Sequence, residues 1–323
     1  MSCPKKKIVC FSGGSAVSKA LFPELKDYPF QITLINSMVD SGGSTGWLRR
    51  ELDVLPPGDL RRHILLLSEA PLWKKKLWEF RFGREEFKGG HKGHSFANIL
   101  ISALENVTGD YQKVLEIIHE FMEVKNHKAL PATIEKTNLC AVLENDEVIV
   151  GEDEIDVPQN HNAGVPIKKL FLDPQTKAYL PTLKAIKKAD AIIIGPGDLY
   201  SSILPCFLPS GIKEAIEASS AKKIYLCNLM TKKGETQNFS VCDFVREIEK
   251  YMNDSLDFVV YNKKMPEQER IERFREENPL LLGIVKEETG PNKKKFIGAD
   301  LILEKGPIVH NSQKVVKIIT SLI

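Results

Sequence analysis

Two segments of the sequence combine glycine and hydroxyl residues as phosphate-binding loops do. The first is Ser12-Gly13-Gly14-Ser15, and the second runs from Asp40 to Gly46. Glycine lets backbone N–H groups approach a phosphate closely, and the N-terminus of a following helix adds a favourable partial charge. The first loop lacks the spacings of the P-loop and of the dinucleotide-binding fingerprint, and an ordinary tight turn has the same composition.

The second loop could supply a metal ligand as well as phosphate contacts. Asp40 could bind Mg²⁺, and it is our candidate catalytic acid, while the loop N–H groups meet phosphate oxygens. The residues expected at the phosphates are Gly42, Gly43, Ser44 and Thr45. The segment also matches G-x-S-x-G of α/β-hydrolases, but Ser44 lies several residues beyond the predicted strand end. No histidine or acid is marked out as its partner, so a serine hydrolase is the least supported function.

An arginine pair follows the turn Pro56-Pro57-Gly58-Asp59. The guanidinium groups of Arg61 and Arg62 could clamp a diphosphate, and a solvent-exposed pair is the alternative. Asp59 is expected to cap a helix. Further on, His94 and Asn98 share one helix face, and we place Asn98 among the nucleotide-binding residues. His91 and His94 have no further ligand at zinc-binding spacing.

Two more polar loops follow apolar runs in the second half of the chain. Gly195-Pro196-Gly197-Asp198 is the third loop, and a fourth begins at Asn228. The carboxyl ends of strands are where open α/β sheets bind ligands, so we assign both loops to one nucleotide crevice. Asp198 is the second candidate for an acid that holds a metal.

Short apolar, β-branched runs must position these loops. We predict strands at Lys7–Phe11, Gln31–Ser37, Ala191–Ile194 and Lys222–Leu226, with their carboxyl ends on one edge of a mainly parallel sheet. Helical periodicity predicts a helical insertion at about 59–130. A hairpin and an exposed polar stretch form an excursion at about 139–172. Since no repeat or clean linker interrupts the chain, we expect a single domain over residues 1–323.

The composition of the chain limits the classes of partner that we expect. With 45 basic and 43 acidic residues the formal net charge is +2, which provides no field for nucleic acid or an anionic membrane. No apolar run approaches the roughly 18 residues that cross a bilayer. The N-terminus has too few apolar residues for a signal peptide, and the six cysteines form no C-x-x-C. We therefore expect a cytoplasmic protein with reduced thiols.

Taken together, the motifs are recognisable. The sequence resembles the YvcK/CofD family, and more closely its bacterial YvcK-like branch, from about Ile8 to the C-terminal helix. The segments that carry the resemblance are IVCFSGG, VDSGGSTGWLRRELDVLPPGDLRR, GHSFANILISALENVTGD, ALPAT, GPGDLYSSILP and YLCNLMTKKGET.

The resemblance implies a Rossmann-like three-layer α/β/α fold, commonly dimeric. Its YvcK-like members are described as UDP-sugar-binding proteins linked to carbon metabolism and cell-wall shape. CofD itself is a Mg²⁺-dependent 2-phospho-L-lactate transferase. The sequence departs from the family at Ser41, where a second Asp is common, at Trp47, where Arg is frequent, and in its first loop. A UDP-sugar-binding regulator is the first hypothesis, and a phosphotransferase is the second.

Overall fold

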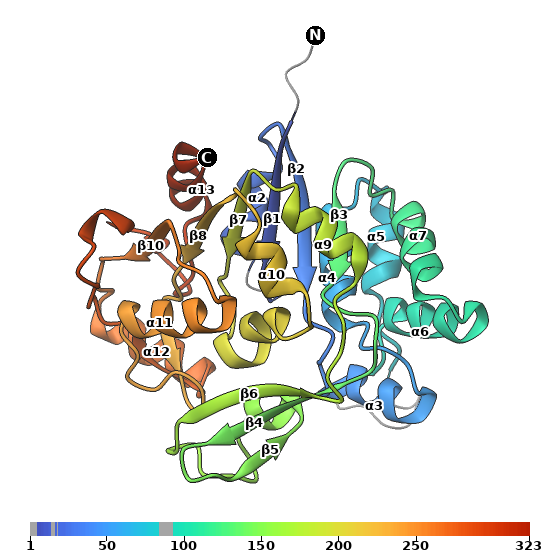
Figure 1. Cartoon of the computed structure of the whole chain (residues 1–323), viewed down its shortest axis with the longest axis horizontal. Coiled ribbons are helices and arrows are strands. Elements are labelled where there is room, and N and C mark those ends of the chain that lie inside the picture. The colour runs from blue at the N-terminus through green and yellow to red at the C-terminus, as the bar shows by residue number, and fades with distance from the viewer. Residues whose placement is uncertain (1–4, 14–16, 18, 84–92) are drawn as a thin grey trace.

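A seven-stranded sheet forms the centre of the molecule (Figure 1). The structure is a computed structural model that describes residues 5–13, 17, 19–83 and 93–323. Every neighbouring pair of strands in this sheet is parallel. In spatial order the strands are β12 (Phe296–Ala299), β10 (Phe258–Asn262), β8 (Lys222–Leu226), β7 (Ala191–Ile194), β1 (Lys6–Phe11), β2 (Phe30–Asn36) and β3 (Lys128–Pro131).

The strand order reverses at the middle of this sheet. From β1 the chain builds β2 and β3 toward one edge, returns to β7 beside β1, and then builds toward the other edge. Open α/β sheets bind ligands outside the carboxyl ends of the strands at such a switch point. The four strands predicted from sequence lie in this sheet in parallel, so their predicted common carboxyl edge is confirmed.

Helices cover both faces of the sheet, which gives the expected three-layer α/β/α fold. Alternate residues of a strand point to opposite faces, so Ile8 and Cys10 pack in one core while Val9 and Phe11 pack in the other. The first core contains α2 (Phe22–Leu25), α4 (Gly58–Leu67), α5 (Leu72–Glu79), α6 (Phe96–Thr108), α7 (Tyr111–Phe121) and α13 (Ser312–Leu322). The second contains α9 (Leu180–Lys187), the π-helix η1 (Leu199–Ile203), the 3-10 helix η2 (Leu204–Phe207), α10 (Ile212–Glu217) and α11 (Val241–Met252).

The segment at about 59–130 is helical, as expected, and it connects β2 to β3. It contains α4 to α7, and α3 (Gly43–Leu52) precedes it. The last residues of this segment form β3, a strand that the sequence reasoning did not anticipate. The helices therefore serve as the crossover between two parallel strands.

A small antiparallel sheet lies apart from the central one, below it in Figure 1. It consists of β5 (Val148–Val150), β4 (Asn138–Leu143) and β6 (Ile167–Asp173). The predicted hairpin is confirmed as β4 and β5. The expectation that the whole following stretch is exposed is wrong, because it contains the short helix α8 (Glu152–Asp156), whose Ile155 is buried in the core.

The remaining elements complete the carboxyl-terminal part of the chain. They are β9 (Met230–Lys232), which pairs with β11 (Leu281–Ile284), together with α12 (Gln268–Glu277) and the 3-10 helix η3 (Lys293–Lys295). Within the residues that the structure describes, none of the helices has the length and apolar character needed to cross a membrane.

Candidate functional site

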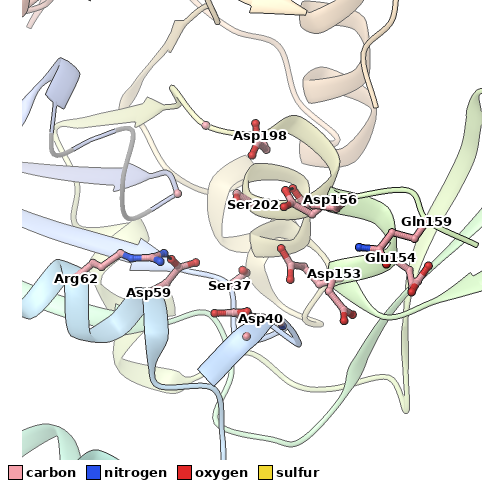
Figure 2. A pocket seen from close by; sticks show the side chains of 17 residues that line it. Ser37, Asp40, Asp59, Arg62, Asp153, Glu154, Asp156, Gln159, Asp198 and Ser202 are labelled. Carbon is pink, nitrogen blue, oxygen red and sulfur yellow. Dashed lines mark hydrogen bonds and ion pairs between the residues drawn. The ribbon is translucent and has the colours of Figure 1, made fainter. Parts of the chain in front are cut away.

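A cavity of about 520 Å³ opens at the carboxyl edge of the central sheet. We call it the acidic crevice, and Figure 2 shows its side chains. Its walls come from the loops after β1, β2 and β7, from the start of α4, and from α8 of the small sheet. The lining residues are Gly13, Ser37, Asp40, Gly42, Gly43, Asp59, Arg62, Glu152, Asp153, Glu154, Asp156, Val157, Gln159, Gly197, Asp198, Ser201 and Ser202.

The lining of the acidic crevice is rich in carboxylic acids. Seven of its side chains are carboxylic acids, and Arg62 is its one guanidinium. Arg62 itself donates to Asp59 at 2.8 Å. A bare diphosphate would be repelled by this lining, whereas a divalent cation would be attracted to it.

Asp40 lies in this lining and is nearly enclosed. Its Oδ1 accepts a hydrogen bond from Gly42 N at 3.0 Å. A Cβ on Gly58 would stand 2.7 Å from Asp40 Oδ2, so only glycine permits this close approach. Burial, followed by the nearby charge of Asp59, raises the pKa of Asp40, while the Gly42 N–H and Arg62 act in the opposite direction.

Helix α8 brings a second buried acid to Asp40. Ser41 N donates to Glu152 Oε2 at 3.3 Å, Ser41 Oγ hydrogen-bonds Asp153, and Asp153 N donates back to Ser41 Oγ at 3.0 Å. Burial raises the pKa of Glu152, and Asp40 and Asp156 raise it further. Ser41, where the family commonly has an acid, thus fastens α8 to the second glycine loop.

Lys232 occupies another cluster of acids in the same region. Within the described part of the chain, the one set of three acidic ligand atoms closer than 4.8 Å is that of Asp156, Asp198 and Glu235. The Lys232 ammonium lies 2.5, 3.0 and 2.8 Å from these carboxylates. Burial alone would lower the pKa of Lys232, but the three carboxylates outweigh it and raise the pKa. Lys232 therefore stands where a metal ion could otherwise bind.

The chemistry of the crevice fits Mg²⁺ on the Asp40 side. Mg²⁺ prefers oxygen ligands and is usually held by one or two carboxylates together with ligand phosphates. Asp40 and Glu152 offer such oxygens, whereas Asp198 is neutralised by Lys232. Of the two acids singled out from sequence, Asp40 is the better candidate ligand.

The first and third glycine loops meet at the switch point. A Cβ on Gly197 would lie 3.0 Å from Gly13 N, so these loops pack backbone against backbone. Gly195 has a φ of +75° and supports this turn without lining the acidic crevice. Gly14 and Ser15, which were also predicted to bind the nucleotide, lie outside the described residues.

A smaller pocket of about 180 Å³, mostly apolar, adjoins the crevice through Gly197 and Asp198. Asn228 lies here, and its Nδ2 donates to Gly197 O at 2.8 Å. Among the described residues no donor reaches its buried Oδ1. The apolar side chains that line this smaller pocket include Ala20, Leu229, Met230, Phe274, Leu281, Ile308 and Val309. Such a pocket suits a planar base that offers one N–H donor.

The other predicted residues lie in a third cavity, of about 370 Å³, which we call the arginine pocket. Ser44, Thr45, Arg61 and Asn98 line it. It shares Asp40, Gly42, Gly43 and Arg62 with the acidic crevice, and Gly58, Arg81 and Gly93 complete its lining. Most of the residues predicted to bind the nucleotide therefore line two adjoining cavities that share four residues.

Ser44 has a histidine neighbour that the sequence did not mark out. Its Oγ lies 2.9 Å from His94 Nδ1, and Asn98 Nδ2 donates to it at 3.3 Å. Trp47 packs against His94 with ring centroids 4.7 Å apart. These contacts hold the Ser44 hydroxyl at the wall of the arginine pocket.

Sequence reasoning missed the acids of α8, Lys232 and Arg81. The run Glu152-Asp153-Glu154-Ile155-Asp156 did carry a signal, because four acids surround one isoleucine. A single buried isoleucine turns such a run into a docked helix with its acids facing a cavity. Lys232 lies within the fourth predicted loop but was not singled out there, and Arg81 lies in an ordinary charged stretch.

The fold and the crevice define an α/β protein with a polar ligand site at the switch point of a parallel sheet. Comparisons with known proteins agree. The profile of the family described as "2-phospho-L-lactate transferase CofD" matches residues 8–300, and this chain belongs to that family. Within the family it lies with the proteins named gluconeogenesis factor, the YvcK-like branch.

Relatives in this branch are similar over most of their length. A putative gluconeogenesis factor of Thermotoga maritima is 40% identical over 272 residues, covering 84% of this chain and 83% of that protein. The gluconeogenesis factor of Bacillus subtilis is 34% identical, covering 99% and 98%. A crystal structure of protein BH3568 from Bacillus halodurans has a TM-score of 0.86 and 33% identity, covering 98% of this chain and 99% of that one.

Proposed function

We propose that this protein binds a nucleotide diphosphate sugar, preferably UDP-linked, and acts as a regulator of carbon metabolism and cell-wall shape. The observation that carries the proposal is the acidic crevice at the switch point, where seven carboxylic acids face glycine-rich backbone. Asp40 would hold a Mg²⁺ ion, whose charge would offset the negative charge of the two phosphates. The preference for UDP rests on membership of the gluconeogenesis factor branch.

Different residues would bind the cation, the phosphates and the base. In this proposal Glu152 would share the cation with Asp40, and Arg62 would donate to a phosphate oxygen. The backbone of Gly13 and Gly197 allows the diphosphate to approach the sheet edge. The base would enter the apolar pocket, where Asn228 Oδ1 accepts one N–H.

Calorimetric titration with UDP-N-acetylglucosamine, UDP-glucose, and their GDP and ADP counterparts tests the proposal. We expect one UDP-sugar to bind per chain, more tightly with Mg²⁺ than with EDTA, and to be recovered unchanged after incubation. If none of these nucleotide sugars binds in Mg²⁺, the proposal fails.

A transferase of the CofD type is the second candidate. It is favoured by the family description and by the neighbouring acids Asp40 and Glu152, whose pKa values are raised by burial. In that reaction an alcohol oxygen forms a bond to the lactate-bearing phosphorus of guanosine diphospho-lactate, and the bond from that phosphorus to the bridging oxygen breaks. Guanosine monophosphate leaves with the electron pair, and the alcohol proton passes to solvent. Incubation with that donor and the deazaflavin alcohol, following guanosine monophosphate, decides between the two. Steady release of guanosine monophosphate would show that the protein is an enzyme and would contradict the proposed regulatory function.

We also propose a cytoplasmic location and a homodimer. The cysteines that the structure describes are all free thiols, which suits a reducing compartment. Light scattering on the purified protein would give the mass of two chains, and the mass of one chain would contradict the dimer.

A further inference from the structure

Arg61 is an unusual residue in this structure because its guanidinium is buried, with acids only in its wider surroundings and not in direct contact. The side chain is 7% exposed, and its Nε has no hydrogen-bond partner. No carboxylate in the described ranges forms an ion pair with it. Burial lowers the pKa of Arg61 to about 10, and Arg62 and Arg81 add to this effect, while the charges of Glu79 and Asp59 act in the opposite direction. A guanidinium held in this way is destabilising until an anion pairs with it.

The surroundings of Arg61 are suited to an anion. Arg62 and Arg81 line the same pocket, which has Asp40 as its one acid among the described lining residues. The pocket also faces the starts of two ten-residue helices, α3 and α4, and no side chain caps either of them. Their first N–H groups therefore add partial positive charge.

From this arrangement we infer that the arginine pocket binds a phosphate group carried by a second small molecule, next to the nucleotide ligand. Arg61 and Arg81, which line this pocket and not the acidic crevice, offer two guanidinium groups to a tetrahedral dianion, whereas a single arginine already satisfies a carboxylate. The hydroxyl of Ser44, fixed by His94 and Asn98, offers a further hydrogen bond to a phosphate oxygen.

The two cavities are large enough to act as separate sites. Small-molecule sites commonly measure about 300–1,000 Å³, and the crevice and the arginine pocket have volumes of about 520 and 370 Å³. Arg61 and Arg81 line the second cavity but not the first. Since Asp40, Gly42 and Gly43 form walls of both, the two ligands would be neighbours.

Titration of the Mg²⁺-free protein with inorganic phosphate tests the inference. We expect saturable binding that Arg81→Gln and Arg61→Gln each weaken at least tenfold. The control Arg273→Gln, an exposed arginine on α12, should bind as the unchanged protein does. Without phosphate, Arg61→Gln should also raise the melting temperature, because it removes a buried charge that has no ion-pair partner. A lower melting temperature, or no unfolding transition, would show that the variant is misfolded.

Binding measurements with the nucleotide sugar and phosphate together test this inference separately from the proposed function. UDP-N-acetylglucosamine and phosphate should bind together, and Arg61→Gln and Arg81→Gln should leave the nucleotide sugar's affinity unchanged. Competition between the two, or equal phosphate binding by all variants, would overturn the inference. Phosphate binding without nucleotide binding would leave the inference in place and overturn the proposed function instead.

Discussion

Asp40 experiences opposing influences on its charge. Burial and Asp59 favour its protonated form, whereas the Gly42 N–H and Arg62 favour the carboxylate. Glu152 faces the same conflict, because burial and the charge of Asp40 raise its pKa while the Ser41 N–H lowers it. A divalent cation would resolve the conflict for both, so the protonation of this pair and its metal affinity must be linked.

The metal affinity should therefore rise with pH. The pKa of Asp40 is raised to about 6, so the folded protein retains protons that an unfolded chain has already released, and Mg²⁺ must displace them. We expect Mg²⁺ to bind more weakly at about pH 5 than at about pH 7.5, with proton release. Calorimetry in two buffers of different ionisation enthalpy measures both. A pH-independent affinity would place the metal elsewhere.

Removing the Asp40 carboxylate should weaken nucleotide binding chiefly when Mg²⁺ is present. Asp40→Ala should cost about 1.5 to 3 kcal/mol in Mg²⁺, roughly ten- to a hundredfold in Kd, and less in EDTA. Ser44→Ala is the comparison, and it should lose at most one hydrogen bond, about 0.5 to 1.5 kcal/mol. Equal losses for Asp40→Ala with and without Mg²⁺ would argue against Asp40 as a ligand.

Among the elements, α8 provides a charged link between the small sheet and the loops of the central sheet, in addition to the apolar packing of β4 and β6 in the same core. Its Asp156 reaches the buried Lys232, which also holds Glu235 and, through Asp198, the loop after β7. Glu235 in turn accepts from Tyr200 N at 2.8 Å. One ammonium group thus fixes the relative positions of three polypeptide segments.

Loss of this ammonium should destabilise the whole protein. Lys232→Met leaves Glu235 buried without its partner, and removing one member of a buried pair costs about 3–5 kcal/mol. Adding Glu235→Gln should recover part of that loss, because a neutral amide needs no counter-charge. Lys168→Met, which removes an exposed pair with Asp146, should cost within about 1 kcal/mol. Urea unfolding measures all four proteins, and similar losses for both lysines would contradict the assignment.

The elements that could be predicted from sequence are those whose own residues specify them. The apolar runs at Lys7–Phe11 and Ala191–Ile194 are buried on both faces, and such strands read as continuous β-branched segments. Strand β3 was missed because its four residues, Lys-Ala-Leu-Pro, include no β-branched residue and end in proline. Glycine and hydroxyl content revealed the loops, but the acids of α8 reach the crevice through tertiary packing, which no local pattern contains.

At the scale of the molecule, a nearly neutral chain separates its charges into adjoining cavities. The formal net charge of +2 gives no sign that one cavity is acidic and its neighbour basic. The acidic walls are contributed by the central sheet and by the small sheet together, as Figure 2 shows for Asp40 and Asp153. Ligand binding should therefore affect both parts of the fold.

Hydrogen exchange can reveal this shared response. With Mg²⁺ and a UDP-sugar we expect slower exchange at the start of α3, in α8 and in η1, and no change in α13, whose residues do not line the crevice. Protection restricted to α3 and η1 would mean that the small sheet takes no part in binding.

Lys232 also determines how the protein responds to the supply of metal. A cation that is covalently part of the chain cannot be removed by a chelator or exchanged for another ion, so the docking of α8 is independent of the magnesium around the protein. The Asp40 side of the same crevice would follow the free ion concentration. In a cell short of magnesium the binding cleft would stay assembled but empty, ready to refill without refolding when the ion returns.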